Sequence, residues 1–176
     1  MNYLKIEEYD IANGLGVRVS LWVSGCQIRC PGCHNPESWD FNNGKPFDKK
    51  AKAKLFEYLS RTEIQGITIT GGNPIEFRNI SEVYALVKEI KNKFPEKDIW
   101  LYSGYPLEYI DFVDERIEMS PLDDVTRILK LCDVVVDGPY VKGMRDISLP
   151  FRGSSNQRII DVKKTLKQKE IILLDI

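Results

Sequence analysis

Hydrophobic residues alternate with polar ones, or gather into short runs, at several places along the chain, and each place predicts a strand. Strands are expected at Val17–Val23, Ile67–Thr70, Asp98–Tyr102 and Val134–Val136. The last of these is apolar throughout, as a strand buried on both faces should be. A further strand is expected at Ile171–Leu174, close to the end of the chain.

Between these strands, apolar residues recur at the spacing of a helix face. Helices are predicted from Asp48 as N-cap to about Arg61, from Asn79 or Ser81 to just before Pro95, from Ser120 as N-cap to about Cys132, and around Asp161–Gln168. Strands that alternate with helices imply βαβ units. We therefore expect an α/β fold, an open and partial β/α barrel with a mostly parallel sheet. No linker or repeat divides residues 1–176, so a single domain is expected.

The most unusual sequences come directly after the predicted strands. A cysteine-rich segment follows the first strand and Gly71-Gly72-Asn73-Pro74 follows the second. Ser103-Gly104-Tyr105 and Asp137-Gly138-Pro139 follow the third and fourth strands. In parallel α/β folds the loops at the carboxyl ends of the strands gather at one rim and build the active site. The four segments are therefore expected to lie together.

Three of the four cysteines, Cys26, Cys30 and Cys33, have the spacing C-x3-C-x2-C. Three thiolates can hold three corners of a cubane iron–sulfur cluster, which is normally held by four, and the fourth iron then stays open for a small molecule. The alternative is a structural zinc site, but zinc usually takes four ligands in two separated pairs. His34 is adjacent to Cys33 and badly placed to share a metal with it. Cys132, on an apolar helix face, is expected to be buried and inert.

Composition narrows the classes of function. With 43% hydrophobic and 29% charged residues the chain is typical of a globular protein, and its formal net charge of −1 gives no electrostatic case for a nucleic-acid partner. No apolar run approaches the ~20 residues that span a bilayer, and the polar start is not a signal peptide. We therefore expect no membrane association and a cytoplasmic protein, in which clustered cysteines indicate metal binding or catalysis more than disulfides.

The cysteine spacing after a strand resembles that of the radical S-adenosylmethionine enzymes. The chain from about Asp10 to Asp161 is similar to one family among them, the activating proteins of anaerobic ribonucleoside-triphosphate reductase. The resemblance is closest at Asp133–Tyr140 and Arg145–Arg158, and it includes Asn13–Arg18.

This resemblance implies a [4Fe–4S] cluster on Cys26, Cys30 and Cys33, with S-adenosylmethionine chelated at the open iron. It implies that an external electron donor such as flavodoxin reduces the cluster, and that cleavage of S-adenosylmethionine yields methionine and a 5′-deoxyadenosyl radical. The radical would then take a hydrogen atom from a glycine of the reductase large subunit, which is the expected partner.

The resemblance also implies roles for residues outside the cysteine set. Gly71, Gly72 and Asn73 stand where these enzymes carry a Gly-Gly-Glu motif that contacts the amino group of the methionine moiety. Asn73 replaces the acidic residue, so its charge is lost while an acceptor remains. Gly32 stands where the superfamily commonly has an aromatic residue near the adenine, and the activating proteins also have glycine there. His34 then provides a flat surface near the adenine, or is a plain loop histidine.

Alternatives remain at this stage. Arg145, Arg152 and Arg158 could bind a carboxylate or the partner protein, or they could form structural salt bridges in a polar loop. The chain as a whole could be a radical enzyme acting on another glycyl-radical enzyme or on a small molecule. In a different class, it could be a non-catalytic zinc-binding interaction module.

Overall fold

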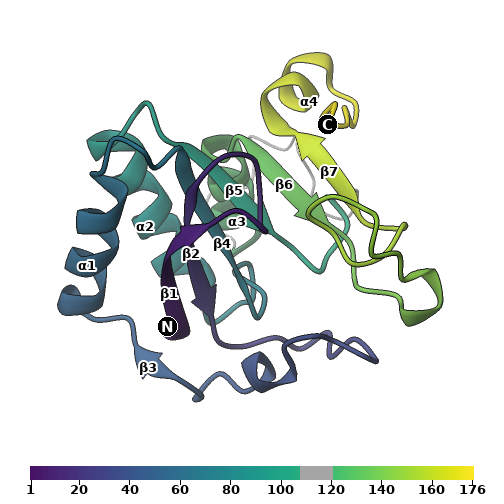
Figure 1. Cartoon of the computed structure of the whole chain (residues 1–176), viewed down its shortest axis with the longest axis horizontal. Helices are drawn as coiled ribbons and strands as arrows, with labels where there is room; N and C mark the ends of the chain where they lie inside the picture. The colour runs from purple at the N-terminus through teal and green to yellow at the C-terminus, as the bar shows by residue number, and fades with distance from the viewer. Residues whose placement is uncertain (108–120) are drawn as a thin grey trace.

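A computed structural model of the chain describes residues 1–107 and 121–176 (Figure 1). In this part of the chain a single sheet has the strand order β3-β1-β2-β4-β5-β6-β7. The strands are β1 (Asn2–Asp10), β2 (Arg18–Val23), β3 (Lys45–Pro46), β4 (Gly66–Gly71), β5 (Asp98–Tyr102), β6 (Val134–Asp137) and β7 (Arg158–Asp161). The helices are α1 (Lys49–Leu59), α2 (Ile80–Lys93), α3 (Pro121–Leu131) and α4 (Val162–Gln168), with 3₁₀ turns η1 (Pro36–Trp39) and η3 (Lys142–Met144).

The sheet is mixed, and the prediction of a mostly parallel sheet is wrong. Strands β2, β4, β5 and β6 are parallel neighbours, as the alternation of strands and helices predicts. The flanking strands, however, pair antiparallel: β1 with β2 and with β3, and β7 with β6. For β1 the reason is the length of its connection to β2, because residues 11–17 are too few for a crossover and allow only an antiparallel return. The sheet is open, as predicted, with β3 and β7 at its ends.

The predicted helices are confirmed where the structure describes them. Asp48 caps α1 by accepting a 2.8 Å hydrogen bond from the Ala51 amide, and Asp161 caps α4 in the same way. Helix α2 ends at Lys93, ahead of Pro95. The predicted N-cap of α3, Ser120, lies outside the described residues. No helix within residues 1–107 and 121–176 is both long and apolar enough to cross a membrane.

Four segments differ from the sequence prediction. Strands β1, β3 and β7 are absent from it, since β1 carries charged residues near the edge of the sheet, β3 has only two residues and β7 follows a long polar loop. The predicted strand Ile171–Leu174 is wrong, because β7 already occupies the position beside β6. The tail runs along β7 and forms one isolated bridge there, between Leu173 and Ile160.

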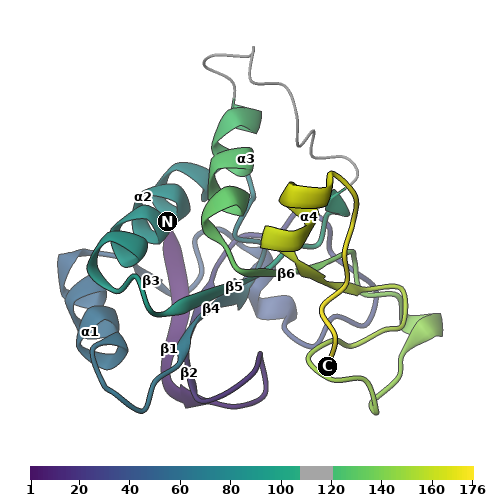
Figure 2. The ribbon, with the colours of Figure 1, turned by 90° about the horizontal axis from the view of Figure 1, so that it is seen from above.

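The two faces of the sheet are covered by different parts of the chain. Ile99, Leu101 and Val135 belong to the main hydrophobic core, which also includes buried residues of α1, α2 and α3. Figure 2 shows α2 and α3 on the same side of the sheet. Trp100 and Val136, which alternate with those residues along β5 and β6, form a smaller core against the C-terminal segments. The helices cover one face of the sheet, and the residues that directly follow the carboxyl ends of the parallel strands are in loops.

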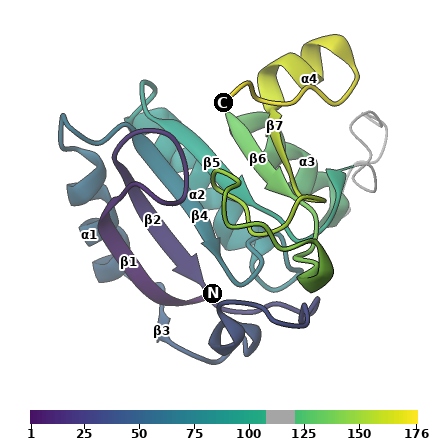
Figure 3. The ribbon, with the colours of Figure 1, turned by 45° about the vertical axis from the view of Figure 1, so that its right-hand side comes forward.

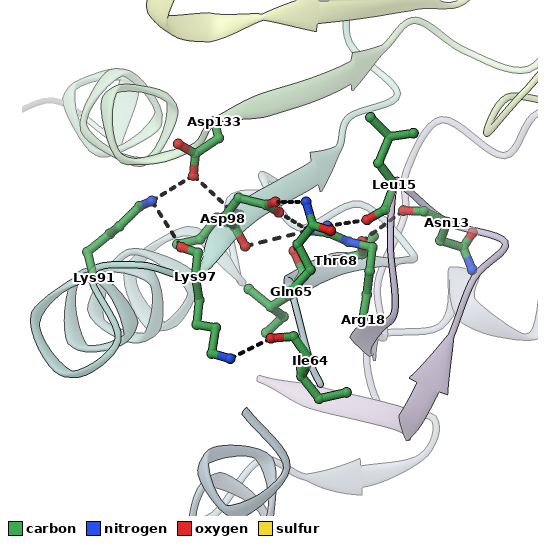
Figure 4. Close-up of polar contacts among 12 residues, drawn as sticks. Asn13, Leu15, Arg18, Ile64, Gln65, Thr68, Lys91, Lys97, Asp98 and Asp133 are labelled. Atoms are coloured by element: carbon green, nitrogen blue, oxygen red, sulfur yellow. Dashed lines mark hydrogen bonds and ion pairs between the residues drawn. The ribbon is translucent and has the colours of Figure 1, made fainter. Parts of the chain in front are cut away.

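A buried polar network lies at the opposite edge, where the parallel strands begin (Figure 4). Arg18 is fully buried; it donates to the Thr68 hydroxyl at 2.9 Å and forms an ion pair with Asp98. Lys91 pairs with Asp133 at 2.6 Å, just before β6. In such folds the amino-end rim serves stability and the carboxyl-end rim serves chemistry. Functional residues are therefore to be sought at the other edge.

Candidate metal centre

The three clustered cysteines lie in the loop that directly follows β2, at the carboxyl ends of the parallel strands (Figures 1 and 3). Cys26, Cys30 and Cys33 are free thiols and half-buried. The start of the loop is held by backbone hydrogen bonds to the segment around η1: the Gly25 amide donates to the Ser38 carbonyl at 2.7 Å, and the Cys26 amide to that of Trp39 at 3.2 Å. These two bonds hold the start of the loop, up to the first cysteine, against η1.

The backbone reverses between the second and third cysteines. The Cys33 amide donates to the Cys30 carbonyl at 3.0 Å, and Gly32 between them has a φ of +79°. A side chain at position 32 would be at ordinary distances from its neighbours, 3.4 Å from Lys142 and 3.5 Å from Tyr140. The backbone conformation, rather than lack of space, therefore favours glycine where the superfamily commonly has an aromatic residue.

The surroundings of the cysteines affect how readily each thiol loses the proton that metal binding requires it to lose. Burial raises the pKa of the Cys26 thiol and of the Cys30 thiol, although backbone amides near each sulfur oppose the shift. The Asn35 amide donates a hydrogen bond to the Cys33 sulfur at 3.4 Å. Metal binding supplies the remaining driving force for deprotonation.

A set of thiolates fits an iron–sulfur cluster better than it fits a single ion. Among the described residues, no three His, Cys, Asp or Glu side chains converge closely enough to hold one metal ion. A cubane takes each cysteine on a different iron, so it does not require three sulfurs to meet at one point. Cys132 is 1% exposed within the main hydrophobic core, directly after α3, and burial raises the pKa of its thiol. The prediction that Cys132 is buried is confirmed.

The Gly-Gly-Asn segment after β4 packs directly against the cysteine loop. The Gly72 amide donates to the Val23 carbonyl at 2.7 Å, and the Asn73 amide to the Gly25 carbonyl at 2.8 Å. A Cβ atom at Gly72 would lie 2.5 Å from the Gly25 oxygen. Gly71 has a φ of +103°. The glycines are therefore needed for the approach of one loop to the other, and their contact with a methionine moiety stays a prediction.

Glu76 is a site residue that the sequence analysis missed. It is 3% exposed and lies three residues after Asn73, in a turn closed by its own amide donating to the Asn73 carbonyl at 3.1 Å. The turn directs its carboxylate back to the cysteine loop, where the Gln27 amide donates to it at 3.0 Å. The Asn-Pro pair was the available signal, because it indicates a turn that returns the following side chain to the rim.

The loop after β5 also reaches the cysteine loop, as the strand-end argument predicts. Gly104 lies against Ile28, so close that a Cβ at position 104 would be 2.2 Å from the Ile28 Cδ1 atom. Tyr105 donates its hydroxyl to Glu76 at 3.2 Å. Desolvation and the nearby Glu76 carboxylate raise the pKa of Tyr105 to about 12, so the phenol stays protonated at neutral pH.

His34 directly follows Cys33 and is exposed. Its ring meets that of Trp22 edge-on, with centroids 6.1 Å apart. Desolvation by the surrounding atoms lowers the pKa of the imidazole, which favours the neutral ring. A neutral aromatic ring at this position suits stacking against a base, and the role of His34 near adenine stays a prediction.

The loop after β6 has a structural part and an exposed part. Arg158 forms an ion pair with the fully buried Asp137, whose Oδ1 accepts from the Arg158 Nε at 3.0 Å, so the structural alternative holds for this arginine. Arg152 donates to the Gln157 carbonyl at 3.2 Å within the same loop. Arg145 is exposed, and this part of the chain passes close to Gly32. All four loops predicted at the rim are therefore placed at one end of the sheet.

Comparison with known proteins agrees with this site. A family model described as a 4Fe-4S single cluster domain matches residues 12–160. The chain is 41% identical over 161 residues to the anaerobic ribonucleoside-triphosphate reductase-activating protein of Pasteurella multocida (strain Pm70), covering 90% of this chain and 96% of that one. It is 42% identical over 159 residues to the protein of that name from Enterobacteria phage T4 (90% and 93%), and 40% identical over 159 residues to that of Escherichia coli (strain K12) (89% and 96%). The chain therefore belongs to the family of anaerobic ribonucleoside-triphosphate reductase-activating proteins.

Proposed function

We propose that this protein is an iron–sulfur enzyme that uses S-adenosylmethionine to install a glycyl radical on the large subunit of an anaerobic ribonucleoside-triphosphate reductase. The observation that carries the proposal is the loop of three free cysteines at the carboxyl ends of the parallel strands, in a chain whose relatives are named as activators of that reductase. When bound, the cluster supplies one electron that cleaves S-adenosylmethionine to methionine and a 5′-deoxyadenosyl radical, which takes a hydrogen atom from the glycine and becomes 5′-deoxyadenosine.

The chain's own residues hold and shield this chemistry. Cys26, Cys30 and Cys33 would each hold one iron of the cluster, and the fourth iron would be left for the amino and carboxylate groups of S-adenosylmethionine. The Gly71–Asn73 segment, which is hydrogen-bonded to the cysteine loop, is proposed to contact the methionine moiety. His34, with its exposed and preferentially neutral ring, is proposed to lie near the adenine.

We propose further that residues 1–176 form one radical S-adenosylmethionine domain whose open sheet is a partial barrel. One continuous core joins the sheet to α1, α2 and α3 and supports this. The proposed electron donor is flavodoxin or a protein of its kind, because the reaction needs one low-potential electron for each S-adenosylmethionine that is cleaved. The proposed compartment is the cytoplasm, where free clustered thiols stay reduced.

The test is anaerobic reconstitution with iron and sulfide, followed by reduction in the presence of S-adenosylmethionine. Products are measured as 5′-deoxyadenosine and methionine in the parent, in Cys26→Ala, Cys30→Ala and Cys33→Ala, and in Cys132→Ala as the matched control. We expect cleavage in the parent and in Cys132→Ala, and a loss of at least about 100-fold in each of the other three variants, because a metal ligand is removed.

A second stage adds the reductase large subunit and measures the glycyl radical by electron paramagnetic resonance. S-adenosylmethionine cleavage with a radical on that subunit supports the full proposal. Cleavage without any radical on it favours another glycyl-radical enzyme or a small molecule as substrate. If the protein takes up zinc but neither iron nor sulfide, the result favours a non-catalytic zinc-binding interaction module.

A further inference from the structure

Three loops of the rim converge on one carboxylate oxygen, the Oε1 atom of Glu76. It accepts from the Gln27 amide at 3.0 Å, from the Tyr105 hydroxyl at 3.2 Å and from the Asn73 side-chain amide at 3.3 Å. These donors come from the loops that follow β2, β5 and β4, respectively. Glu76 is thus the point at which the cysteine loop, the Gly-Gly-Asn loop and the Ser-Gly-Tyr loop are joined.

All three donors are uncharged, although Glu76 is buried, with 3% of its surface exposed. Within residues 1–107 and 121–176, Glu76 forms no ion pair with a Lys, Arg or His side chain, and its second oxygen, Oε2, accepts no hydrogen bond. A buried carboxylate is stabilised chiefly by a cation or by several donors on both oxygens. Glu76 therefore has its negative charge and its Oε2 atom available for a ligand group that donates hydrogen bonds.

Asn73, which donates to Glu76, carries no charge that could replace that of the Glu76 carboxylate. Asn73 stands at the motif position where related enzymes carry an acidic residue, and its own side chain is used locally: Nδ2 donates to Glu76, and Oδ1 accepts from the Ile75 amide at 3.4 Å. The backbone amide of Asn73 also donates a hydrogen bond to the carbonyl of Gly25, the residue before Cys26. Asn73 is thus placed to orient Glu76 and has no charge of its own to offer a ligand.

We infer that Glu76 accepts a hydrogen bond from the α-amino group of S-adenosylmethionine, supplying the negative charge that Asn73 lacks. The inference rests on the proposed function, since it requires that S-adenosylmethionine binds at this rim. An amino group that binds iron through its nitrogen lone pair keeps two N–H groups, whereas the sulfonium has none, so the amino group can donate a charge-assisted hydrogen bond to Oε2. Gln27, which donates to Oε1, adjoins Cys26, so the carboxylate lies beside the cluster loop.

The decisive variant is Glu76→Gln, which keeps an oxygen for the Gln27 amide and the Tyr105 hydroxyl while it removes the charge. The reconstituted protein is titrated anaerobically, by calorimetry, with S-adenosylmethionine and with 5′-methylthioadenosine, which lacks the amino-acid moiety. We expect Glu76→Gln to weaken S-adenosylmethionine binding roughly 10- to 100-fold, the usual worth of a charge-assisted hydrogen bond. Binding of 5′-methylthioadenosine should change less than about twofold.

The matched control is Glu37→Gln, which removes an exposed carboxylate from the segment that follows the cysteine loop and should leave both affinities unchanged. The swapped variant Asn73→Asp with Glu76→Gln restores one negative charge and one amide to the pair, and should recover most of the affinity for S-adenosylmethionine. Iron content and the melting temperature Tm are measured on each variant. If Glu76→Gln alone binds less iron, the affinity of the swapped variant for S-adenosylmethionine tests the inference in its place.

Equal S-adenosylmethionine affinity in the parent and Glu76→Gln, at equal iron content, would overturn the inference. So would an equal loss for both ligands, or a swapped variant that folds and binds cluster without recovering affinity, because each indicates that Glu76 only holds the loops together. A parent protein with a full cluster that binds no S-adenosylmethionine would instead refute the proposed function, which is a distinguishable result.

Discussion

Replacing Gly72 by alanine tests whether the Gly-Gly-Asn loop is a packing element of the rim. The added Cβ would lie 2.5 Å from the Gly25 oxygen, 2.9 Å from its carbon and 3.0 Å from its nitrogen. All three are backbone atoms, so no flexible side chain can move away. The loop must shift, and with it the hydrogen bonds from Gly72 to Val23 and from Asn73 to Gly25.

The cost can be worked from these contacts. Forcing one methyl group into a closely packed site costs about 1–3 kcal/mol. Weakening two backbone hydrogen bonds adds roughly 1 kcal/mol, since each has a net worth of that order and the shift does not abolish both. A total of about 2–4 kcal/mol lowers the Tm of a chain of this size by roughly 10 °C.

The measurement is the Tm of the metal-free protein by circular dichroism, so that cluster binding does not enter. Gly143→Ala is the matched control, because a Cβ there would have no atom within 4 Å, and its Tm should change by less than about 3 °C. If Gly72→Ala melts within the error of Gly143→Ala, the close approach of the two loops is not a feature of the folded protein, and the structural explanation of the glycine pair fails.

Two further predictions concern the polar edge where the strands begin. Arg18→Met leaves Asp98 without its buried partner and should cost about 3 kcal/mol of unfolding free energy in urea, whereas adding Asp98→Asn should recover part of it; a single variant as stable as the parent would contradict the pairing. For Asp133, burial raises the pKa of the carboxyl, but hydrogen bonds from Lys163 and Lys91 outweigh it and leave that pKa below its ordinary value. Because the folded pKa is depressed, this stabilisation is present above the ordinary Asp pKa and is lost as the pH falls through the folded value. Asp133→Asn should therefore be less stable than the parent at neutral pH, with a difference that shrinks in acid; a difference independent of pH between 7 and 2 would refute this.

Local pattern was sufficient for the parallel centre of the sheet and for its helices. The alternation and runs of apolar residues that predict β2, β4, β5 and β6 depend on burial on both faces, and a buried strand carries that requirement in its own residues. Caps such as Asp48 and Asp161 act within one turn, so they can be recognised without knowledge of the partner elements.

Local pattern was insufficient at the two sides of the sheet. Strand β1 is charged and β7 follows a polar loop, so neither shows the signal of a buried strand. Each forms because the neighbouring strand has backbone N–H and C=O groups that need hydrogen-bond partners. The position of that neighbouring strand is set by the tertiary structure. The same competition displaced the tail at Ile171–Leu174, since β7 had already taken the edge of β6.

The candidate site divides along the same line. The spacing of Cys26, Cys30 and Cys33 indicates iron–sulfur chemistry by itself, because one loop supplies all three thiolates. The glycine requirement at Gly72 and the place of Glu76 were decided only by tertiary structure: both depend on how far one loop lies from another, a distance set by the pairing of β2 with β4. The sequence alone therefore determined which cofactor the rim suits, and the packing of three loops decided where the charge beside it lies.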